Sequence, residues 1–429
     1  KLDKSFSDKG HMLKKSIFGL ILATSFTFSG MVFAVTELSM WYHGAGNEVE
    51  SKLIKQIISD FNSSQSNWRV NLESFPQESY NSSVVAAALA GKLPDIIDVD
   101  GPILPNWAWS GYMAPLNLKP GALDNFLPGA IGRWKGQVYG VGLWDAACAI
   151  YARKSVLQKH GIRIPTLSKP WNKQEFDSAL DKLQGSGDFD YAIDLGMAWK
   201  GEWYPYAFGP FLQSHGGDII DVRRNSAEGS LNGNAGMNFG NWWKSLFDRK
   251  LTPGTSQDGA DRETGFLDGK YAMQWNGNWA AIAPLEKFGD DMLFLPAPDF
   301  GQGSKIGAAS WQFGISSNSK HKDGATSFIE FAIQDKYLAA FSDGIGLIPP
   351  TPASARLSEK YRPGGPLEVF FDLSKQQATL RAVTPAYIVA GPIFEKAMAD
   401  IANGADVADT LDAAADEINA DIEKNKGYQ

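Results

Sequence analysis

Residues 38–61 read LSMWYHGAGNEVESKLIKQIISDF, and this stretch decides the fold. Its first five residues alternate, with Leu38, Met40 and Tyr42 expected on one face, which predicts a short half-buried strand. Asn47 stands three residues before Glu50, as in a helix capping box. Apolar residues then recur at the helical period, which predicts an amphipathic helix with the buried stripe Val49, Leu53, Ile57 and Phe61.

The same alternation of strand and helix continues downstream. We expect a second strand around residues 70–75, a helix over 80–90 and a third strand from residue 94. Such alternation is typical of an α/β protein in which helices cover both faces of a parallel sheet. Ligands of such sheets bind in the loops at the carboxyl ends of the strands.

Two further features concern the rest of the chain. Near its end, one stripe of a predicted helix is apolar and is expected to be core: Val407, Leu411, Ala414, Ile418 and Ile422. Gly and Pro gather at residues 295–303 and 348–352. Because hinges lie at the ends of elements, we expect these two clusters to be crossings between lobes.

The first 34 residues predict an export signal. Met12 is followed by two lysines, an apolar run over 17–28 and small residues up to Ala34. We expect a signal peptide over 12–34, cleaved after Ala34, preceded by a leader over 1–11. An apolar run of about 12 residues is shorter than the roughly 20 that cross a bilayer, and no cysteine follows the signal to carry an acyl anchor. The prediction is a free periplasmic protein.

Charge and cysteine content narrow the function further. The formal net charge is -8, and the first 34 residues carry five Lys against two Asp, so the remainder is more acidic still. An acidic chain is expected to repel nucleic acid. Cys148 is the only cysteine, so packing rather than disulfides must stabilise the fold. We expect a monomer.

No catalytic or metal motif is visible. The four histidines after the signal lie far apart, without the spacing of a metal site: His43, His160, His215 and His321. The chain has no G-x-S-x-G elbow and no P-loop. We therefore expect no enzyme activity, no cofactor and no metal.

Aromatic residues are the most informative part of the composition. The chain has 14 Trp, 13 Tyr and 25 Phe. Many Trp stand in polar or Gly-rich stretches that read as loops: Trp107, Trp109, Trp144, Trp199, Trp203, Trp275, Trp279 and Trp311. A sugar has an apolar face and a rim of hydroxyls, so its site needs flat aromatic surfaces together with carboxylates, amides and Arg. The alternative for each Trp is core packing.

Two stretches resemble a known family. Residues 91–116 read GKLPDIIDVDGPILPNWAWSGYMAPL, and residues 134–158 read WKGQVYGVGLWDAACAIYARKSVLQ. Both are similar to signatures of the family 1 extracellular solute-binding proteins of bacterial ABC importers, which include the maltose-binding proteins. Three later blocks agree in order, from Gly265, from Ala309 and over 384–424. The chain departs from the pattern at Gly142, where Pro is usual, and at Ala152-Arg153, which replace Asn-Lys.

The resemblance implies a periplasmic-binding-protein-like α/β fold with two lobes, a hinge and a central ligand cleft. The first lobe would comprise residues 35–143 and 314–349, and the second lobe residues 144–313 and 350–429. The chain would cross between the lobes three times. The protein would bind a small carbohydrate and deliver it to the permease subunits of an ABC importer.

Carried over by position, the resemblance implies a set of ligand-binding residues. They are Trp41, His43, Gln77, Asp100, Trp144, Asp145, Gly201, Glu202, Trp203, Trp275, Trp279, Trp311 and Arg381. Asp100, Asp145 and Arg381 would bind hydroxyls, Trp311 or Trp275 would stack on a sugar ring, and His43 would donate to a ligand oxygen.

Three hypotheses remain open on these residues. The first is a disaccharide or glycosyl-polyol binder, since several aromatics and few charges suit a neutral ligand. The second is a binder of a sulfonated or phosphorylated sugar, held by Arg381 and His43. The third is a secreted glycoside hydrolase that uses Asp100 and Asp145 as acid and nucleophile.

Overall fold

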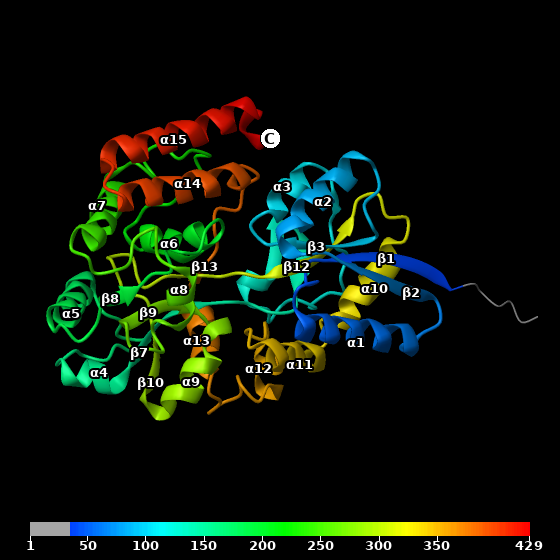
Figure 1. Ribbon diagram of the computed structural model, residues 1–429. Coiled ribbons are helices and arrows are strands. Elements are labelled where there is room, and N and C mark those ends of the chain that lie inside the picture. The colour runs from blue at the N-terminus through cyan, green and yellow to red at the C-terminus, as the bar shows by residue number, and fades with distance from the viewer. Residues whose placement is uncertain (1–34) are drawn as a thin grey trace, which may run out of the picture. The chain divides into compact units, whose positions relative to one another are not determined.

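The computed structural model describes residues 35–429, in which two sheets form the centres of two lobes (Figure 1). The predicted leader 1–11, the signal 12–34 and its cleavage after Ala34 lie outside the described residues. Each lobe is built on its own sheet, as the α/β prediction requires.

The first lobe contains a sheet with the strand order β2-β1-β3-β12-β6-β5, and β4 pairs with β12. Its strands are β1 (Thr36–Tyr42), β2 (Trp68–Ser74), β3 (Ile96–Asp100), β4 (Met113–Ala114), β5 (Ile131–Trp134), β6 (Gln137–Gly142) and β12 (Trp311–Ser316). β1 pairs in parallel with β2 and β3, as predicted. β12 runs antiparallel to β3 and β6, so the sheet is mixed rather than parallel throughout.

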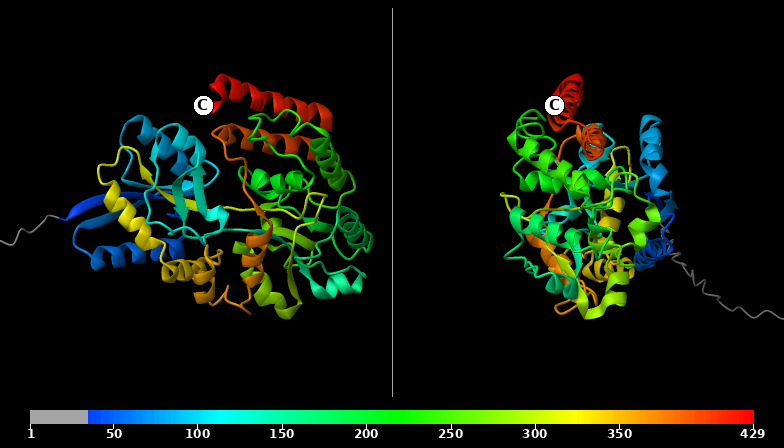
Figure 2. Two further views of the ribbon diagram at one scale, coloured as in Figure 1. Left: turned by 180° about the vertical axis from the view of Figure 1, so that it is seen from behind. Right: turned by 60° about the vertical axis from the view of Figure 1, so that its left-hand side comes forward.

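Helices cover both faces of this sheet, as predicted. They are α1 (Glu48–Ser64), α2 (Gln77–Leu89), α3 (Leu104–Trp109), α10 (Lys322–Ala332) and α11 (Asp335–Ile345). One face packs on α1, α10 and α11, and the other packs on α2 and α3, so the lobe has two apolar cores. α10 comes late in the chain but lies with the first lobe in every view (Figures 1 and 2).

The N-cap predicted at Asn47 is confirmed, but the Glu50 side chain does not complete the capping box, and the buried stripe of α1 is rotated. The side chain of Asn47 accepts a hydrogen bond from the Glu50 backbone N–H at 3.1 Å. Glu50 is buried, whereas Val49 is exposed and Leu53 is only half-buried. The helix therefore turns the acidic side chain of Glu50 toward the interior.

The second lobe contains a sheet with the order β10-β7-β9-β8. Its strands are β7 (Cys148–Arg153), β8 (Tyr191–Asp194), β9 (Tyr271–Gly277) and β10 (Met292–Leu295), and a separate pair joins β11 (Ile306–Gly307) to β13 (Ala378–Thr379). The helices are α4 (Lys154–Lys159), α5 (Lys173–Gly185), α6 (Trp203–Ser214), α7 (Asn234–Asp248), α8 (Gly259–Thr264), α9 (Ile282–Phe288), α13 (Glu368–Gln377), α14 (Tyr387–Ala402) and α15 (Val407–Lys424). Every residue of the apolar stripe predicted in α15 is buried.

Three passages of the chain join the lobes, and backbone hydrogen bonds tie them together. The Asp145 N–H donates to the Ile348 carbonyl at 2.8 Å, and the Ile348 N–H donates back at 2.9 Å. The Ala146 N–H donates to the Ala309 carbonyl at 2.9 Å. The third passage leads into α12 (Pro352–Leu357), which packs on α11.

The crossing predicted at 348–352 agrees with this hinge, but the one predicted at 295–303 was wrong. Residues 295–303 stay in the second lobe, where the Asp299 N–H donates to Trp171 O at 2.8 Å. The crossing lies near Ala309 instead. β12 begins at Trp311, so residues 311–313, which we expected in the second lobe, belong to the first sheet.

Candidate functional site

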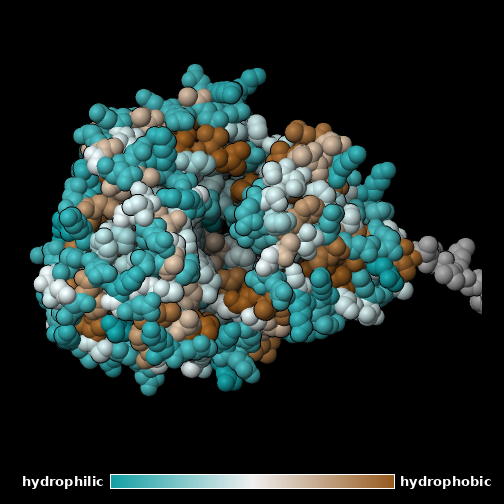
Figure 3. Space-filling model, in the orientation of Figure 1, coloured by the Kyte–Doolittle hydropathy of each residue, from teal (hydrophilic) through white to brown (hydrophobic). Residues whose placement is uncertain are grey.

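A cleft of about 480 Å³ lies between the lobes. In Figure 3 the surface is hollowed there, and hydrophobic surface flanks the hollow. The first lobe contributes the loop after β1, the starts of α1 and α2 and the end of β3. The second lobe contributes the segment before α6, the turn after β9 and the segment after β13. Both lobes therefore face the same space, at the carboxyl ends of strands.

Most of the predicted ligand-binding residues line this cleft. They are His43, Gln77, Asp100, Trp144, Glu202, Trp203, Trp279, Trp311 and Arg381. They come from both lobes and from the passages between them. The prediction that these distant positions meet in one place agrees with the structure.

The wall of the first lobe is a stacked pair of rings. The imidazole of His43 lies parallel to the indole of Trp311, with ring centroids 3.8 Å apart. Nδ1 of His43 forms a short hydrogen bond with the buried carboxylate of Asp98. Burial lowers the pKa of His43, but the carboxylates of Asp98, Glu50 and Asp100 outweigh this effect and raise it overall. His43 is thereby held in place and its charged form is favoured.

Glu50 lies beneath His43 and explains the rotation of α1. Its carboxylate accepts a short hydrogen bond from the Tyr42 hydroxyl and lies 3.8 Å from Nε2 of His43. Burial raises the pKa of Glu50, and His43 and Tyr42 only partly offset that effect. The start of α1 therefore supplies an acid to the cleft.

The second lobe supplies an ion pair. Oε1 of Glu202 accepts hydrogen bonds from Nη1 of Arg381 and from the Tyr387 hydroxyl, and Nη2 of Arg381 donates to the Ala308 carbonyl at 3.2 Å. The charge of Arg381 is thus already balanced within the protein.

Asp100 is a half-buried carboxylate that lines the cleft. Within residues 35–429 its side chain has no hydrogen-bond partner, although it lines the cleft. Burial raises the pKa of Asp100 to about 7, and the negative charge of Glu202 adds to this while Arg381 opposes it. A ligand hydroxyl that donates to this group would replace the missing partner.

An aromatic wall in the second lobe faces this acid. Trp199 and Trp203 meet edge to face with centroids 4.8 Å apart, and Trp279 lies 6.0 Å from Tyr206. All four line the cleft. Such rings present flat apolar surface to the CH face of a sugar.

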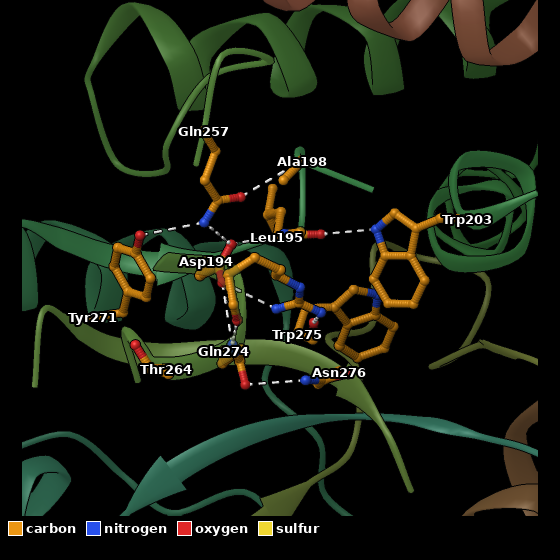
Figure 4. A network of polar contacts seen from close by, with 12 residues as sticks. Asp194, Leu195, Ala198, Trp203, Gln257, Thr264, Tyr271, Gln274, Trp275 and Asn276 are labelled. Atoms are coloured by element: carbon orange, nitrogen blue, oxygen red, sulfur yellow. Dashed lines mark hydrogen bonds and ion pairs between the residues drawn. The ribbon is translucent and has the colours of Figure 1, made fainter. Parts of the chain in front are cut away.

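A buried polar network holds this wall from behind (Figure 4). Arg262, from α8, lies with its guanidinium carbon 4.2 Å from the Trp199 ring centroid. It pairs with Asp194 at 3.0 Å, and both side chains are fully buried. Gln257 and Gln274 also donate to the Asp194 carboxylate, at 3.0 and 3.2 Å. The guanidinium of this network packs against the rings of Trp199 and Trp203.

Gly196 makes this packing possible. Its φ is +78°, and a Cβ there would lie 2.9 Å from both Nε of Arg262 and Nε1 of Trp203. A side chain at this position would displace the cation or the ring. With glycine at position 196, the indole N–H of Trp203 donates to the Leu195 carbonyl at 3.1 Å.

Four predicted residues lie outside the cleft lining: Trp41, Asp145, Gly201 and Trp275. Trp41 packs on Phe75 with centroids 4.7 Å apart. The Gly201 N–H donates to the Glu395 carboxylate at 2.8 Å. Trp41 is thus a packing residue, whereas Gly201 is exposed and its backbone binds Glu395.

Trp275 is a core residue, so the prediction that it stacks on a sugar was wrong. Its side chain is fully buried, its N–H donates to the Ala207 carbonyl at 3.2 Å, and its ring lies 5.0 Å from that of Phe211. β9 lies between β7 and β8 and is buried along its whole length. A Trp in such a strand has no route to solvent.

Asp145 belongs to the hinge. Its carboxylate accepts from the N–H groups of Ala146 at 2.8 Å and Ala309 at 3.2 Å, and from the Ser374 hydroxyl at 2.7 Å. Burial raises its pKa to about 6, although these hydrogen bonds oppose the shift. Because Asp145 does not face the cleft, it cannot act with Asp100 as the acid and nucleophile of a hydrolase.

The sequence reasoning missed several cleft residues. Four of them are large or polar, namely Asn47, Glu50, Trp199 and Tyr206. The others are Ala146, Ala309, Ser310, Ile345 and Leu347. Trp199 was noted as a loop residue but not chosen. Asn47 and Glu50 were interpreted only as a helix cap. Their place directly after the first strand was the available signal, because that loop opens onto the cleft.

The comparison with protein families identifies the class of protein. Residues 56–363 match the family described as bacterial extracellular solute-binding protein, and the chain belongs to that family. The family consists of binding proteins rather than enzymes, and the hydrolase hypothesis is not supported.

Two bacterial proteins are similar to this chain at low sequence identity. A mannitol-binding protein from Pseudomonas aeruginosa is 27% identical over 61% of this chain and 61% of its own length. A protein named as an uncharacterized lipoprotein in the oleD 5' region of Streptomyces antibioticus is 24% identical over 69% of this chain and 66% of its own length. The chain thus spans less than two-thirds of either relative.

Solved structures show the same fold. The cyclic alpha-maltosyl-1,6-maltose binding protein from Arthrobacter globiformis superposes with a TM-score of 0.76 at 20% identity, over 91% of this chain and all of that one.

Among the described residues, no helix is both long and apolar enough to span a membrane, and no three His, Cys, Asp or Glu side chains gather as metal ligands.

Proposed function

We propose that the protein captures a neutral disaccharide or glycosyl-polyol in the cleft and delivers it to the permease subunits of an ABC importer. One observation carries the proposal. The Trp311–His43 stack of the first lobe and the Trp199–Trp203–Trp279 wall of the second lobe line the same cleft. A ring bound between them contacts both lobes at once.

The polar groups of the cleft suit the hydroxyl rim of such a ligand. Asp100 offers a carboxylate without a partner among the described residues, and Asn47 and Gln77 add amides. Charge-assisted hydrogen bonds to a carboxylate are shorter and stronger than neutral ones. The ligand's hydroxyls would therefore bind chiefly at Asp100.

The distribution of charge favours a neutral ligand over a sulfonated or phosphorylated one. The cleft lining contains Glu50, Asp100 and Glu202 against Arg381 and His43. Arg381 is paired with Glu202, and His43 with Asp98. An anionic ligand would therefore find both cations already paired with carboxylates. The carboxylate of Asp100, which has no such partner, would repel it.

Delivery would depend on closure of the lobes. A ligand that contacts both lobes only in the closed form stabilises that form by its differential affinity. The permease then distinguishes the loaded from the empty protein by shape. One relative is a mannitol-binding protein, and two proteins with a similar fold were solved in complex with acarbose and with maltose. These similarities support a search among sugars and polyols.

A thermal-shift screen tests the proposal. The panel would contain neutral disaccharides, glycosyl-glycerols, mannitol, and sulfonated and phosphorylated sugars, because a ligand that binds only the native state raises Tm. We expect the largest shift from a neutral glycoside, and no product when that compound is incubated with the protein. A shift confined to the anionic sugars, or none across the panel, would refute the proposal.

A further inference from the structure

Two polar side chains from different elements meet in the wall of the first lobe. His43 follows β1, Glu50 lies in the first turn of α1, and both line the cleft. Nε2 of His43 and Oε1 of Glu50 are 3.8 Å apart, which is too long for a direct hydrogen bond. A single oxygen atom, however, can lie about 2.8 Å from each of two atoms at this separation. The pair therefore leaves a place for one hydroxyl group.

The atoms that would hold this hydroxyl can be reached from the cleft. Within residues 35–429, neither Nε2 of His43 nor Oε2 of Glu50 has a hydrogen-bond partner. Unlike Oδ1 of Asp98, neither atom is sealed from solvent. The side chains of His43 and Glu50 are 5% and 9% exposed. They are thus part of the wall, and the surface that they keep lines the cleft.

Partners behind the pair fix the role of each atom. Nδ1 of His43 is bound to the buried carboxylate of Asp98, and Trp311 stacks on the ring with centroids 3.8 Å apart. Because a carboxylate only accepts, Nδ1 carries a hydrogen, and Nε2 is a donor whenever the imidazole is protonated. Oε1 of Glu50 accepts from the Tyr42 hydroxyl, which leaves Oε2 as an acceptor. One donor and one acceptor therefore stand side by side.

We propose that His43 and Glu50 form a specificity subsite for one ligand hydroxyl, which accepts from Nε2–H of His43 and donates to the Glu50 carboxylate. Asp98 and Tyr42 are positioning residues, since each holds one member of the pair and neither lines the cleft. The inference rests on the proposed function and adds a requirement to its ligand. Fluorine accepts but does not donate, an ammonium group donates but does not accept, and only a hydroxyl does both.

The subsite should depend on pH. Burial lowers the pKa of His43, but the surrounding carboxylates outweigh this effect and raise it overall, so the donor form is favoured. The neutral ring would leave two acceptors with one hydroxyl hydrogen between them, so affinity should fall as pH rises through the pKa of His43. The titratable groups that face His43 are Glu50 of α1, Asp98 and Asp100 of β3, Tyr42 of β1 and Tyr80 of α2.

Matched analogues test the subsite. Methyl glucoside, methyl galactoside and maltose would be titrated by calorimetry beside their monodeoxy and monodeoxyfluoro analogues. For the sugar that binds, we expect loss of one particular hydroxyl to weaken binding at least about tenfold. The fluoro analogue at that position should lose nearly as much, because fluorine cannot donate to Glu50. Fluoro analogues that all bind like the parent sugar would overturn the inference and leave the proposed function standing.

Variants assign the position, because Asp100 would require a hydroxyl of its own. Glu50→Gln keeps the size of the side chain and an oxygen for the Tyr42 hydroxyl, but it presents an N–H to the ligand. We expect it to weaken the parent sugar at least about fivefold while one deoxy analogue binds as it does to wild type. Glu48→Gln, in the same helical turn but exposed and outside the cleft lining, is the matched control. Equal losses for the parent and every deoxy analogue would refute the subsite.

Asp98→Asn tests the positioning role without any sugar. The pKa of the His43 imidazole, followed by NMR, should be lower than in wild type by about 1 or more, because the carboxylate that favours the charged ring is removed. The affinity of the bound sugar should then fall at a correspondingly lower pH. An unchanged pKa, or an affinity profile that does not move with it, would refute the role assigned to Asp98.

The outcomes separate the subsite from the proposed function. If none of the sugars binds, the proposed function fails, and glycerol becomes the probe of the subsite itself. Glycerol should shift the His43 Hε1 resonance in wild type and in Glu48→Gln but not in Glu50→Gln. The absence of a shift in wild type, or equal shifts in both variants, would refute the subsite. If Glu50→Gln does not fold, His43→Gln replaces it in the titrations with the same expected result.

Discussion

At the scale of single residues, Asp100 and Asp145 show how much the surroundings of a carboxylate decide. Both were predicted to bind a ligand, and both have a raised pKa, although Asp145 is buried and Asp100 is half-buried. Asp100 lines the cleft without a partner among residues 35–429, whereas Asp145 is satisfied by Ala146, Ala309 and Ser374. Only the first is available to a ligand, and the second stabilises the hinge.

The buried acid of the hinge predicts a pH dependence of stability. The pKa of Asp145 rises from 3.8 to about 6 on folding, so between these values the folded state holds a proton that the unfolded state has lost. Stability should therefore fall as pH rises through this window, with the full cost present above pH 6 and absent below pH 4. At about 1.4 kcal/mol per pKa unit, the cost is at most about 3 kcal/mol.

Asp145→Asn measures this effect. The amide can accept from the same N–H groups and donate to the Ser374 hydroxyl, so the hinge geometry is kept. We expect the variant to be about 1–3 kcal/mol more stable than wild type at pH 7.5 and similar to it at pH 4, by urea unfolding. Asp290→Asn, at an exposed position, is the control. Parallel pH profiles for wild type and Asp145→Asn would contradict this account.

Trp311 carries the second prediction at this scale. Trp311→Ala removes the ring that stacks on His43 and faces the cleft, and we expect ligand affinity to fall at least tenfold. Titration calorimetry with the best ligand of the screen would measure the loss. Trp134→Ala, in β5 and away from the cleft lining, should leave affinity unchanged. A wild-type affinity in Trp311→Ala would refute the stacking role.

At the scale of elements, the aromatic wall is supported by a strand and a helix that do not line the cleft. β8 supplies Asp194, α8 supplies Arg262, and together they support Trp199 and Trp203. Nη1 of Arg262 donates to Asp194 and Nη2 donates to the Trp275 carbonyl. Removing one member of such a buried ion pair leaves the other charge uncompensated. The wall is therefore coupled to the stability of the second lobe.

Arg262→Met tests this coupling. We expect it to destabilise the protein by about 3–5 kcal/mol in urea unfolding, because Asp194 is left buried without its cation. Arg224→Met, which breaks the partly exposed pair with Asp221, should destabilise the protein far less, because water screens that pair. Similar losses in the two variants would show that the buried pair has no special role.

At the scale of the whole molecule, three hydrogen-bonded passages join two lobes that share one cleft. Few elements have to change when the lobes move, because the rotation can be absorbed at those passages. The lobes also touch away from the hinge, where the rings of Trp109 and Tyr428 lie 4.8 Å apart.

Closure should be visible in solution. Saturation with the best ligand of the screen is expected to reduce the radius of gyration measured by small-angle X-ray scattering. At a ligand concentration of 100 times Kd, binding should also stabilise the protein by about 2.7 kcal/mol. A sugar that gives no thermal shift is the control. Unchanged scattering at saturation with a tight ligand would exclude closure as the signal.

Much of the architecture was predictable from the sequence, because local patterns report local structure. The strand at 38–42, the cap at Asn47 and the stripe of α15 were each predicted from periodicity, and the order of the family signatures indicated two lobes. The clustering of distant aromatic and acidic residues in one cleft was also expected from that resemblance. These features depend on neighbours in the chain or on motifs.

Tertiary structure alone decided which of those residues meet a ligand. A Trp in a Gly-rich stretch reads alike at 275 and at 279, yet one lies in a central strand and the other in the cleft. In the sequence, Glu50 resembles part of a helix cap, whereas in the structure its carboxylate contacts Tyr42 and His43. The sequence by itself determined the α/β elements and the class of protein. Burial and partners across the fold decided which side chains can bind a ligand, because both depend on contacts between residues far apart in the chain.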